Sequence, residues 1–171
     1  MRVFLSACLL TLAINPAHAQ TPAIEIETAR YLDCIERVEP EPDQAFEDAL
    51  AWRMEGGGWP AAHCEALALI ALGDTTGGAL SLEELAGTTD GGRDSVIRSA
   101  MLVDAGKAWL TIGRSEDAQR AFAAALELNP DDPDALLGQA SAALALGDWP
   151  LAGEAATAVI GQAPDLAEAW R

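Results

Sequence analysis

The sequence predicts an all-α protein in which helix–turn–helix pairs stack side by side as a solenoid. The prediction rests first on a repeat, because the segment 99–132 returns as 133–166 with the same punctuation. Small and large apolar residues also occupy fixed offsets in the two copies, and each copy closes on a Pro-Asp dipeptide. A fixed period of 34 residues is typical of helix–turn–helix repeats, which bury their apolar faces only by stacking on neighbours.

The first copy carries Gly113, Ala118, Phe122, Ala125 and Pro130, and the second carries Gly147, Ala152, Ala156, Val159 and Pro164 at the same offsets. These repeated positions resemble the tetratricopeptide repeat (TPR) family. The first copy carries nearly the whole family pattern, at Leu102, Ala105, Gly106, Trp109, Gly113, Ala118, Phe122, Ala125 and Pro130. The second copy keeps the pattern at Leu136, Ala140, Gly147, Ala152 and Pro164. It departs at the large positions, which hold Gln139, Ala143 and Ala156. The resemblance implies a right-handed α-solenoid of TPR-like pairs.

Turn and capping residues delimit the helices of the repeated segment. Asp94 is expected to cap a long first helix, and Gly113 suits the left-handed conformation that ends it. Ser115 is expected to cap the next helix. Asp132 followed by Pro133 then marks the start of a third helix. We expect Phe122, between these caps, to be a packing residue rather than part of a binding surface.

Two degenerate helix pairs are expected before the clear repeats. The first pair is predicted at 26–38 and 43–55, because the intervening prolines cannot lie inside a helix without cost. The second pair begins with a helix over 59–72. Its partner is predicted to be short, over 79–86, since two glycines precede it and Ser81 opens a capping box there.

The N-terminus has the pattern of a secretory signal peptide. Arg2 is followed by an apolar run and by the small-x-small site Ala17-His18-Ala19, which predicts cleavage before Gln20. A lipoprotein-type box ending at Cys8 is the less favoured alternative, because the apolar run continues past it. The signal peptide predicts a periplasmic or secreted protein without stable membrane insertion after cleavage.

These assignments divide the chain into three segments. Residues 1–19 are the predicted signal peptide, and 20–98 hold the degenerate TPR-like pairs with a predicted disulfide. Residues 99–171 hold two well-formed repeats and the start of a further helix, which Trp170 enters at its first large position.

The composition excludes a nucleic-acid-binding role. The formal net charge is −17, and the sequence contains no basic run. Such a field repels nucleic acid and anionic membrane surfaces.

The cysteines Cys34 and Cys64 are expected to form a disulfide. They are the even pair left after signal cleavage, in a compartment that favours disulfides. Both would lie on first helices of neighbouring pairs, which stack side by side in TPR arrays. The alternative is a metal or thiol-redox site that includes His63, but the spacing matches no zinc pattern.

No catalytic constellation is found in the sequence. His63 is the only histidine beyond the signal peptide, so no Ser–His–Asp set or two-histidine metal site can form. The glycines 56–58 are not followed by the lysine of a phosphate loop. We therefore expect a non-catalytic protein without cofactor or metal.

The resemblance implies where a partner would bind. In TPR proteins the first helix of each pair lines a concave groove, which places candidate binding positions at His63, Leu67, Ile70, Val103, Lys107, Leu110, Leu137, Ser141 and Leu144. This mostly apolar set favours an apolar or helical segment of a protein or peptide partner. The alternative for several of these residues is a place in the core.

Two further alternatives remain at this point. Lys107, the only lysine, either pairs with Asp104 on its own helix or orients an acidic or carbonyl group of the partner. The runner-up function is structural, a self-associating array whose C-terminal face near Trp170 is covered by another copy.

Overall fold

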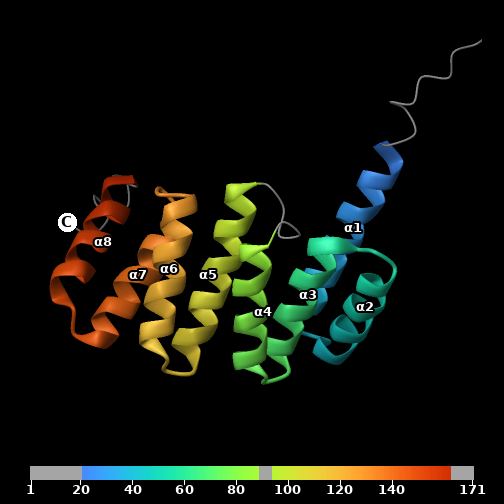
Figure 1. Cartoon of the computed structure of the whole chain (residues 1–171), viewed down its shortest axis with the longest axis horizontal. Helices are drawn as coiled ribbons and strands as arrows, with labels where there is room; N and C mark the ends of the chain where they lie inside the picture. Colours follow the sequence, from blue (N-terminus) through green and yellow to red (C-terminus); the bar gives the residue numbers. More distant parts are fainter. Residues whose placement is uncertain (1–20, 89–93, 163–171) are drawn as a thin grey trace, which may run out of the picture.

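The computed structural model of the chain describes residues 21–88 and 94–162 (Figure 1). Within these ranges the regular structure consists of eight α-helices: α1 (Thr21–Arg37), α2 (Pro42–Met54), α3 (Gly58–Ala71), α4 (Thr75–Gly87), α5 (Ser95–Thr111), α6 (Ser115–Leu128), α7 (Pro133–Leu146) and α8 (Trp149–Gln162). The predicted signal peptide and the further helix that would contain Trp170 lie outside the described residues.

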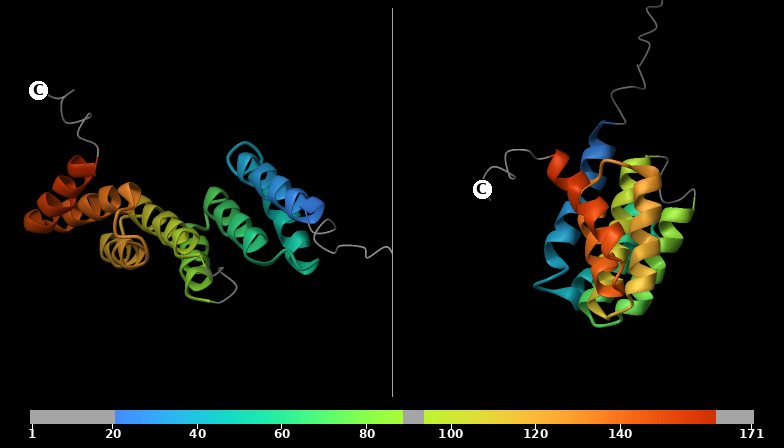
Figure 2. Two further views of the ribbon diagram at one scale, coloured as in Figure 1. Left: turned by 90° about the horizontal axis from the view of Figure 1, so that it is seen from above. Right: turned by 90° about the vertical axis from the view of Figure 1, so that its left-hand side faces the viewer.

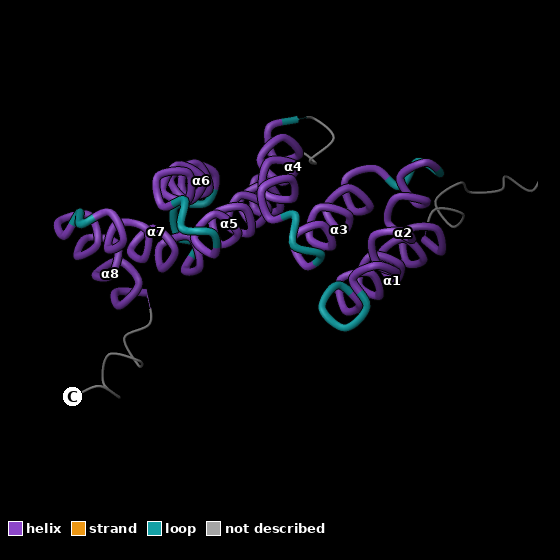
Figure 3. Tube along the Cα trace, turned by 90° about the horizontal axis from the view of Figure 1, so that it is seen from below, coloured by secondary structure: helices purple, strands orange, loops and turns teal. Residues whose placement is uncertain are grey.

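The helices form an elongated array, with α1 and α2 at one end and α8 at the other (Figures 1 and 2). Each helix packs on the next along the chain, and α1 also contacts α3 as α5 contacts α7. In the view along the helices, α4 and α6 lie on one side of the row made by α3, α5 and α7 (Figure 3). The predicted all-α solenoid is therefore confirmed. No helix in the described ranges is both long and apolar enough to cross a bilayer.

The main apolar core runs through α3 to α7 and has Phe122 near its centre. This side chain is fully buried on α6, between a glycine of α5 and a glycine of α7. A Cβ atom at Gly106 would lie 2.7 Å from the Phe122 ring, and one at Gly138 would clash with the same ring. The ring therefore occupies space that only glycine leaves free on both neighbouring helices. The prediction that Phe122 is a packing residue is confirmed.

Most of the predicted caps of the repeated segment are confirmed. The Asp94 carboxylate accepts from the amide of Val96, and that of Asp132 accepts from the amides at the start of α7. Gly113 adopts a φ of 75°, in the left-handed region. The prediction for Ser115 is wrong, because α6 begins at Ser115 itself and Arg114 stands before it. A residue inside the first turn can no longer act as the cap.

The predicted short form of α4 is also wrong. The helix begins at Thr75, and its cap is Asp74, whose side chain accepts from the amide of Gly77 at 2.9 Å. The two glycines that favoured a late start lie inside the helix, and Gly78 is there because a larger residue would collide with α3. A Cβ atom at Gly78 would lie 2.5 Å from the Ala66 carbonyl oxygen and 2.5 Å from Ile70 Cγ1 on α3. Gly78 therefore allows α3 and α4 to pack closely.

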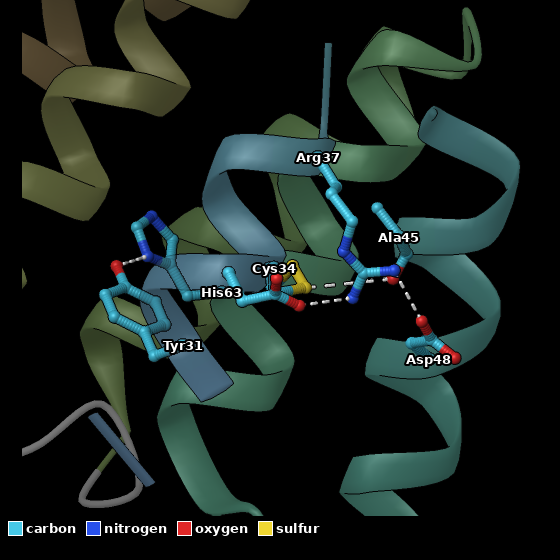
Figure 4. The surroundings of a disulfide bond; sticks show 8 residues. Tyr31, Cys34, Arg37, Ala45, Asp48 and His63 are labelled. Carbon is cyan, nitrogen blue, oxygen red and sulfur yellow. Dashed lines mark hydrogen bonds and ion pairs between the residues drawn. A yellow bond between two sulfur atoms is a disulfide. The ribbon is translucent and has the colours of Figure 1, made fainter. Parts of the chain in front are cut away.

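The N-terminal helices have a smaller core of their own, which surrounds a disulfide (Figure 4). Cys34 of α1 and Cys64 of α3 are bonded, with their Cα atoms 6.2 Å apart. Both residues are buried, and Ala45 and Ala49 of α2 pack beside them. The predicted disulfide is thus present in the structure, where it ties the first helix to the third.

Candidate partner-binding surface

The nine candidate binding residues fall into three groups by exposure. The structure buries His63 and Val103. Three are partly buried against the core: Leu67, Ile70 and Leu110. Four are exposed: Lys107, Leu137, Ser141 and Leu144. The exposed group lies on α5 and α7 alone, whereas the predicted groove positions of α3 are buried or partly buried.

His63 is buried because a side chain from α1 covers it. The Tyr31 hydroxyl lies 2.7 Å from His63 Nδ1, and the two rings are stacked with centroids 5.9 Å apart (Figure 4). On the other side, His63 Nε2 lies 3.3 Å from an Asp104 carboxylate oxygen on α5. With only 7% of its surface exposed, His63 links three helices and is corrected from a groove residue to a packing one.

The Tyr31 hydroxyl is held in its neutral form. Burial and, to a smaller extent, the nearby Asp104 carboxylate together raise the pKa of Tyr31 to about 12. A neutral hydroxyl can donate or accept a hydrogen bond, so Tyr31 can bond to His63 Nδ1 in either direction.

Val103 is also a core residue. Only 3% of its surface is exposed, and it belongs to the main apolar core with its neighbours on α5. Its side chain therefore supplies packing and no surface to a partner. The alternative noted for several groove positions, a place in the core, applies to Val103.

Lys107 pairs across helices and not within its own. Its ammonium lies 2.9 Å from a carboxylate oxygen of Asp134 at the start of α7, and both side chains are more than half exposed. The expected partner Asp104 is instead directed to His63. The pairing with Asp104 is therefore wrong, because Asp104 faces α3 while Lys107 reaches α7. In the 34-residue repeat, Ser141 of α7 is the position equivalent to Lys107. Asp134 lies two turns before Ser141, so the repeat gives no reason to expect it as the partner of Lys107.

An exposed row of side chains follows α7 from this ion pair. Leu137 and Leu144 are 59% and 52% exposed, and they lie two turns apart on the same helix face. Between them Ser141 donates its hydroxyl hydrogen bond to the Leu137 carbonyl at 2.9 Å. We call the exposed set Lys107, Asp134, Leu137, Ser141 and Leu144 the α5–α7 face. It combines two apolar contacts with one balanced ion pair.

A cavity of about 310 Å³ lies elsewhere, between α3 and α4. Charged and polar side chains line it, among them the ion-paired Arg53 and Glu65 together with Glu84. None of the nine candidate residues contributes to it. Among the residues that the structure describes, no three His, Cys, Asp or Glu side chains gather where they could hold a metal ion.

Comparison with known families matches one part of the chain. Residues 103–167 match the family model described as tetratricopeptide repeat, a range that covers most of α5 and all of α6, α7 and α8. No curated protein sequence matches the chain. The match contains every exposed member of the α5–α7 face.

Proposed function

Residues 103–167 belong to the tetratricopeptide repeat family, and from this premise we propose that the chain is a non-catalytic interaction module that binds a segment of a protein partner on its α5–α7 face. The observation that carries the proposal is the pair of exposed leucines on α7, Leu137 and Leu144. Two large apolar side chains that point to solvent two turns apart suit the apolar face of a partner helix or extended segment.

The net charge of the chain favours a partner with basic groups. Asp134 already balances the charge of Lys107, so the α5–α7 face carries no net positive charge. The whole chain carries a net charge of −17. A basic segment would be steered toward such a surface, whereas an acidic one would be repelled. We therefore propose an apolar segment flanked by Lys or Arg.

The proposed location is the periplasm or the outside of the cell. The disulfide between Cys34 and Cys64 supports it, because disulfides form and persist in oxidising compartments. The signal-peptide pattern over 1–19 agrees with the same location. A thiol-redox role is the weaker alternative, since both sulfur-bearing residues are buried and reactive cysteines are partly accessible.

A capture experiment with matched variants tests the proposal. Tagged wild-type protein, the double variant Leu137→Ser/Leu144→Ser and the control Leu32→Ser would be incubated with a periplasmic extract. Leu32 is a similarly exposed leucine, 55% exposed on α1 at the other end of the array. We expect the captured partners to be lost with the double variant and kept with the control. Capture that survives the double substitution would place the interaction elsewhere.

The partner's charge can be read from Lys107→Ala. This substitution frees Asp134 and makes the α5–α7 face more acidic. Binding of a basic segment should then be unchanged or tighter at low salt, and the melting temperature should hardly move. Weaker binding would instead mean that Lys107 holds an acidic or carbonyl group of the partner.

A further inference from the structure

The last described helix, α8, carries an exposed stripe that no described helix covers. We define the α8 stripe as the four residues Trp149, Gly153, Ala156 and Ile160. Their spacing of four, three and four residues places them on one helix face. Trp149 is 70% and Ile160 is 55% exposed, and Gly153 has open space where a Cβ would stand. The helix packs on α7 through another face, where Ala152 and Ala155 are buried.

The α8 stripe differs from the equivalent face of α6. The position 34 residues before Ala156 is Phe122, whose ring reaches α7 at Gly138. In α8 this projecting ring is replaced by a methyl group. The middle of the α8 stripe is therefore flat, and its two large side chains stand at the ends. A flat centre allows another helix to approach closely.

The order of the stripe is the same when it is read from either end. It runs large, small, small, large, and its centre lies between residues 154 and 155. When two copies of α8 are laid antiparallel about this centre, Trp149 faces Ile160 of the other copy and Gly153 faces Ala156. Such reciprocal matching is what a twofold interface requires. We propose that the chain forms a homodimer through antiparallel pairing of the α8 stripes.

The distribution of charge favours pairing of the α8 stripe with α8 of a second copy over pairing with α1 of a second copy. Two chains of net charge −17 repel each other, so they can meet only where acids are scarce. Glu154 is the one charged residue within α8. The helix at the other end, α1, exposes Glu27, Asp33 and Glu36. A head-to-tail contact would set the apolar stripe against these carboxylates, whereas α8 against α8 avoids them.

Sedimentation of matched variants tests the dimer. The wild type, Ala156→Glu and the control Ala158→Glu would be compared across the micromolar range. Both alanines are exposed on α8, but Ala158 lies outside the stripe. We expect twice the chain mass for the wild type and the control, and the single-chain mass for Ala156→Glu with unchanged circular dichroism. Ile160→Glu serves as a second disrupting variant.

A charge pair tests the register of the proposed pairing. Gly153→Lys and Ala156→Glu should each be single chains when purified alone. In a mixture, the lysine of one copy would face the glutamate of the other, so dimers should return. Rescue would be expected only for this antiparallel alignment.

Two results would overturn the proposal. One is a single-chain mass for the wild type throughout the concentration range, as when residues 163–171 or another protein cover the stripe. The other is a dimer that survives both Ala156→Glu and Ile160→Glu. Salt distinguishes the proposed dimer from partner binding on the α5–α7 face. Added salt screens the repulsion between two acidic chains, so it should strengthen the dimer. The same added salt should weaken the binding of a basic partner to the α5–α7 face.

Discussion

Helices α5 to α7 and helices α1 and α2 are stacked in the same antiparallel manner but are held by different interactions (Figure 1). In the C-terminal region, one aromatic ring enters space left by glycines on both neighbours, as Phe122 does at Gly106 and Gly138. This apolar packing sets the spacing of the three helices, and Ser99 of α5 adds hydrogen bonds to the Ala125 carbonyl of α6 and to Asp132 at the start of α7.

The N-terminal region relies on covalent and polar links. The disulfide joins α1 to α3, and the Tyr31 hydroxyl bonds to His63 on the same pair of helices. Trp52 of α2 donates its indole N–H to Glu27 of α1 at 3.0 Å. The apolar cluster around the disulfide is small and made largely of alanines. Stability in this region therefore depends on oxidation state and on hydrogen bonds.

The family match begins at residue 103, inside α5, and does not include the N-terminal helices. Within the matched range, small and large apolar residues recur at fixed offsets, and Phe122 packs against Gly106 and Gly138. Helices α1 and α2 keep the arrangement of the helices but rely on the disulfide and on polar contacts. A fold can thus continue past the point where its sequence pattern is recognisable.

The largest effect is expected from removing the interlocking ring. Phe122→Ala leaves a cavity between three helices and should lower the free energy of unfolding by about 3–5 kcal/mol. Phe46→Ala is the matched control in the N-terminal region, where that ring is only partly buried. Urea unfolding of both variants should show a clearly smaller loss for Phe46. Equal losses would mean that the two regions are held in the same way.

Removing the disulfide should have the next largest effect. The bond closes a loop with a sequence separation of 30 residues, which corresponds to about 3–4 kcal/mol on the chain-entropy estimate. We expect Cys34→Ala/Cys64→Ala to lose this amount in thermal or urea unfolding. Reductant should destabilise the wild type equally and leave the double variant unchanged. A wild type indifferent to reductant would contradict the proposed role of the bond.

A smaller effect is expected where α3 and α4 meet. Gly78→Ala would bring a methyl group against the Ala66 carbonyl and Ile70, and overpacking of this kind costs about 1–3 kcal/mol. Gly87→Ala in the same helix meets nothing within 4 Å and should be neutral or slightly stabilising. Destabilisation by Gly87→Ala but not by Gly78→Ala would show that the close contact is wrong.

The smallest effect is expected at Tyr31. Tyr31→Phe removes the hydrogen bond to His63 and should cost about 0.5–1.5 kcal/mol. Because Tyr31 is the only tyrosine, absorbance titration of the wild type reports it alone. The folded-state pKa is raised to about 12, so this group's contribution is full below pH 10 and is lost as the pH rises toward 12. A folded-state midpoint near 10 would contradict its burial.

Sequence reasoning reached most of the helix order but not the contacts that depend on distant segments. Proline and glycine punctuation located α2, α3, α5 and α7 closely, whereas it placed the start of α1 at residue 26 and the structure begins this helix at Thr21. It misjudged the start of α4. Gly78 lies inside this helix because a side chain there would collide with Ala66 and Ile70 of α3. Local propensity has no access to such a contact.

The candidate surface shows the same limit. The family register correctly placed Leu137 and Leu144 where they are exposed. It also placed His63 there, although Tyr31, 32 residues earlier in the chain, covers it. The partner of Lys107 is 27 residues later and two turns off the repeat register. Positions within one repeat could be predicted, whereas side chains that cross between repeats could not.

Hydrogen exchange with and without reductant tests most directly whether the two regions are held differently. Reduction of the disulfide should remove amide protection from α1 and α2, while α5, α6 and α7 keep theirs, because the Phe122 interlock does not involve the bond. The Cys34→Ala/Cys64→Ala variant should show the reduced pattern under both conditions. Protection lost evenly along the chain, or kept in α1 and α2, would contradict this division.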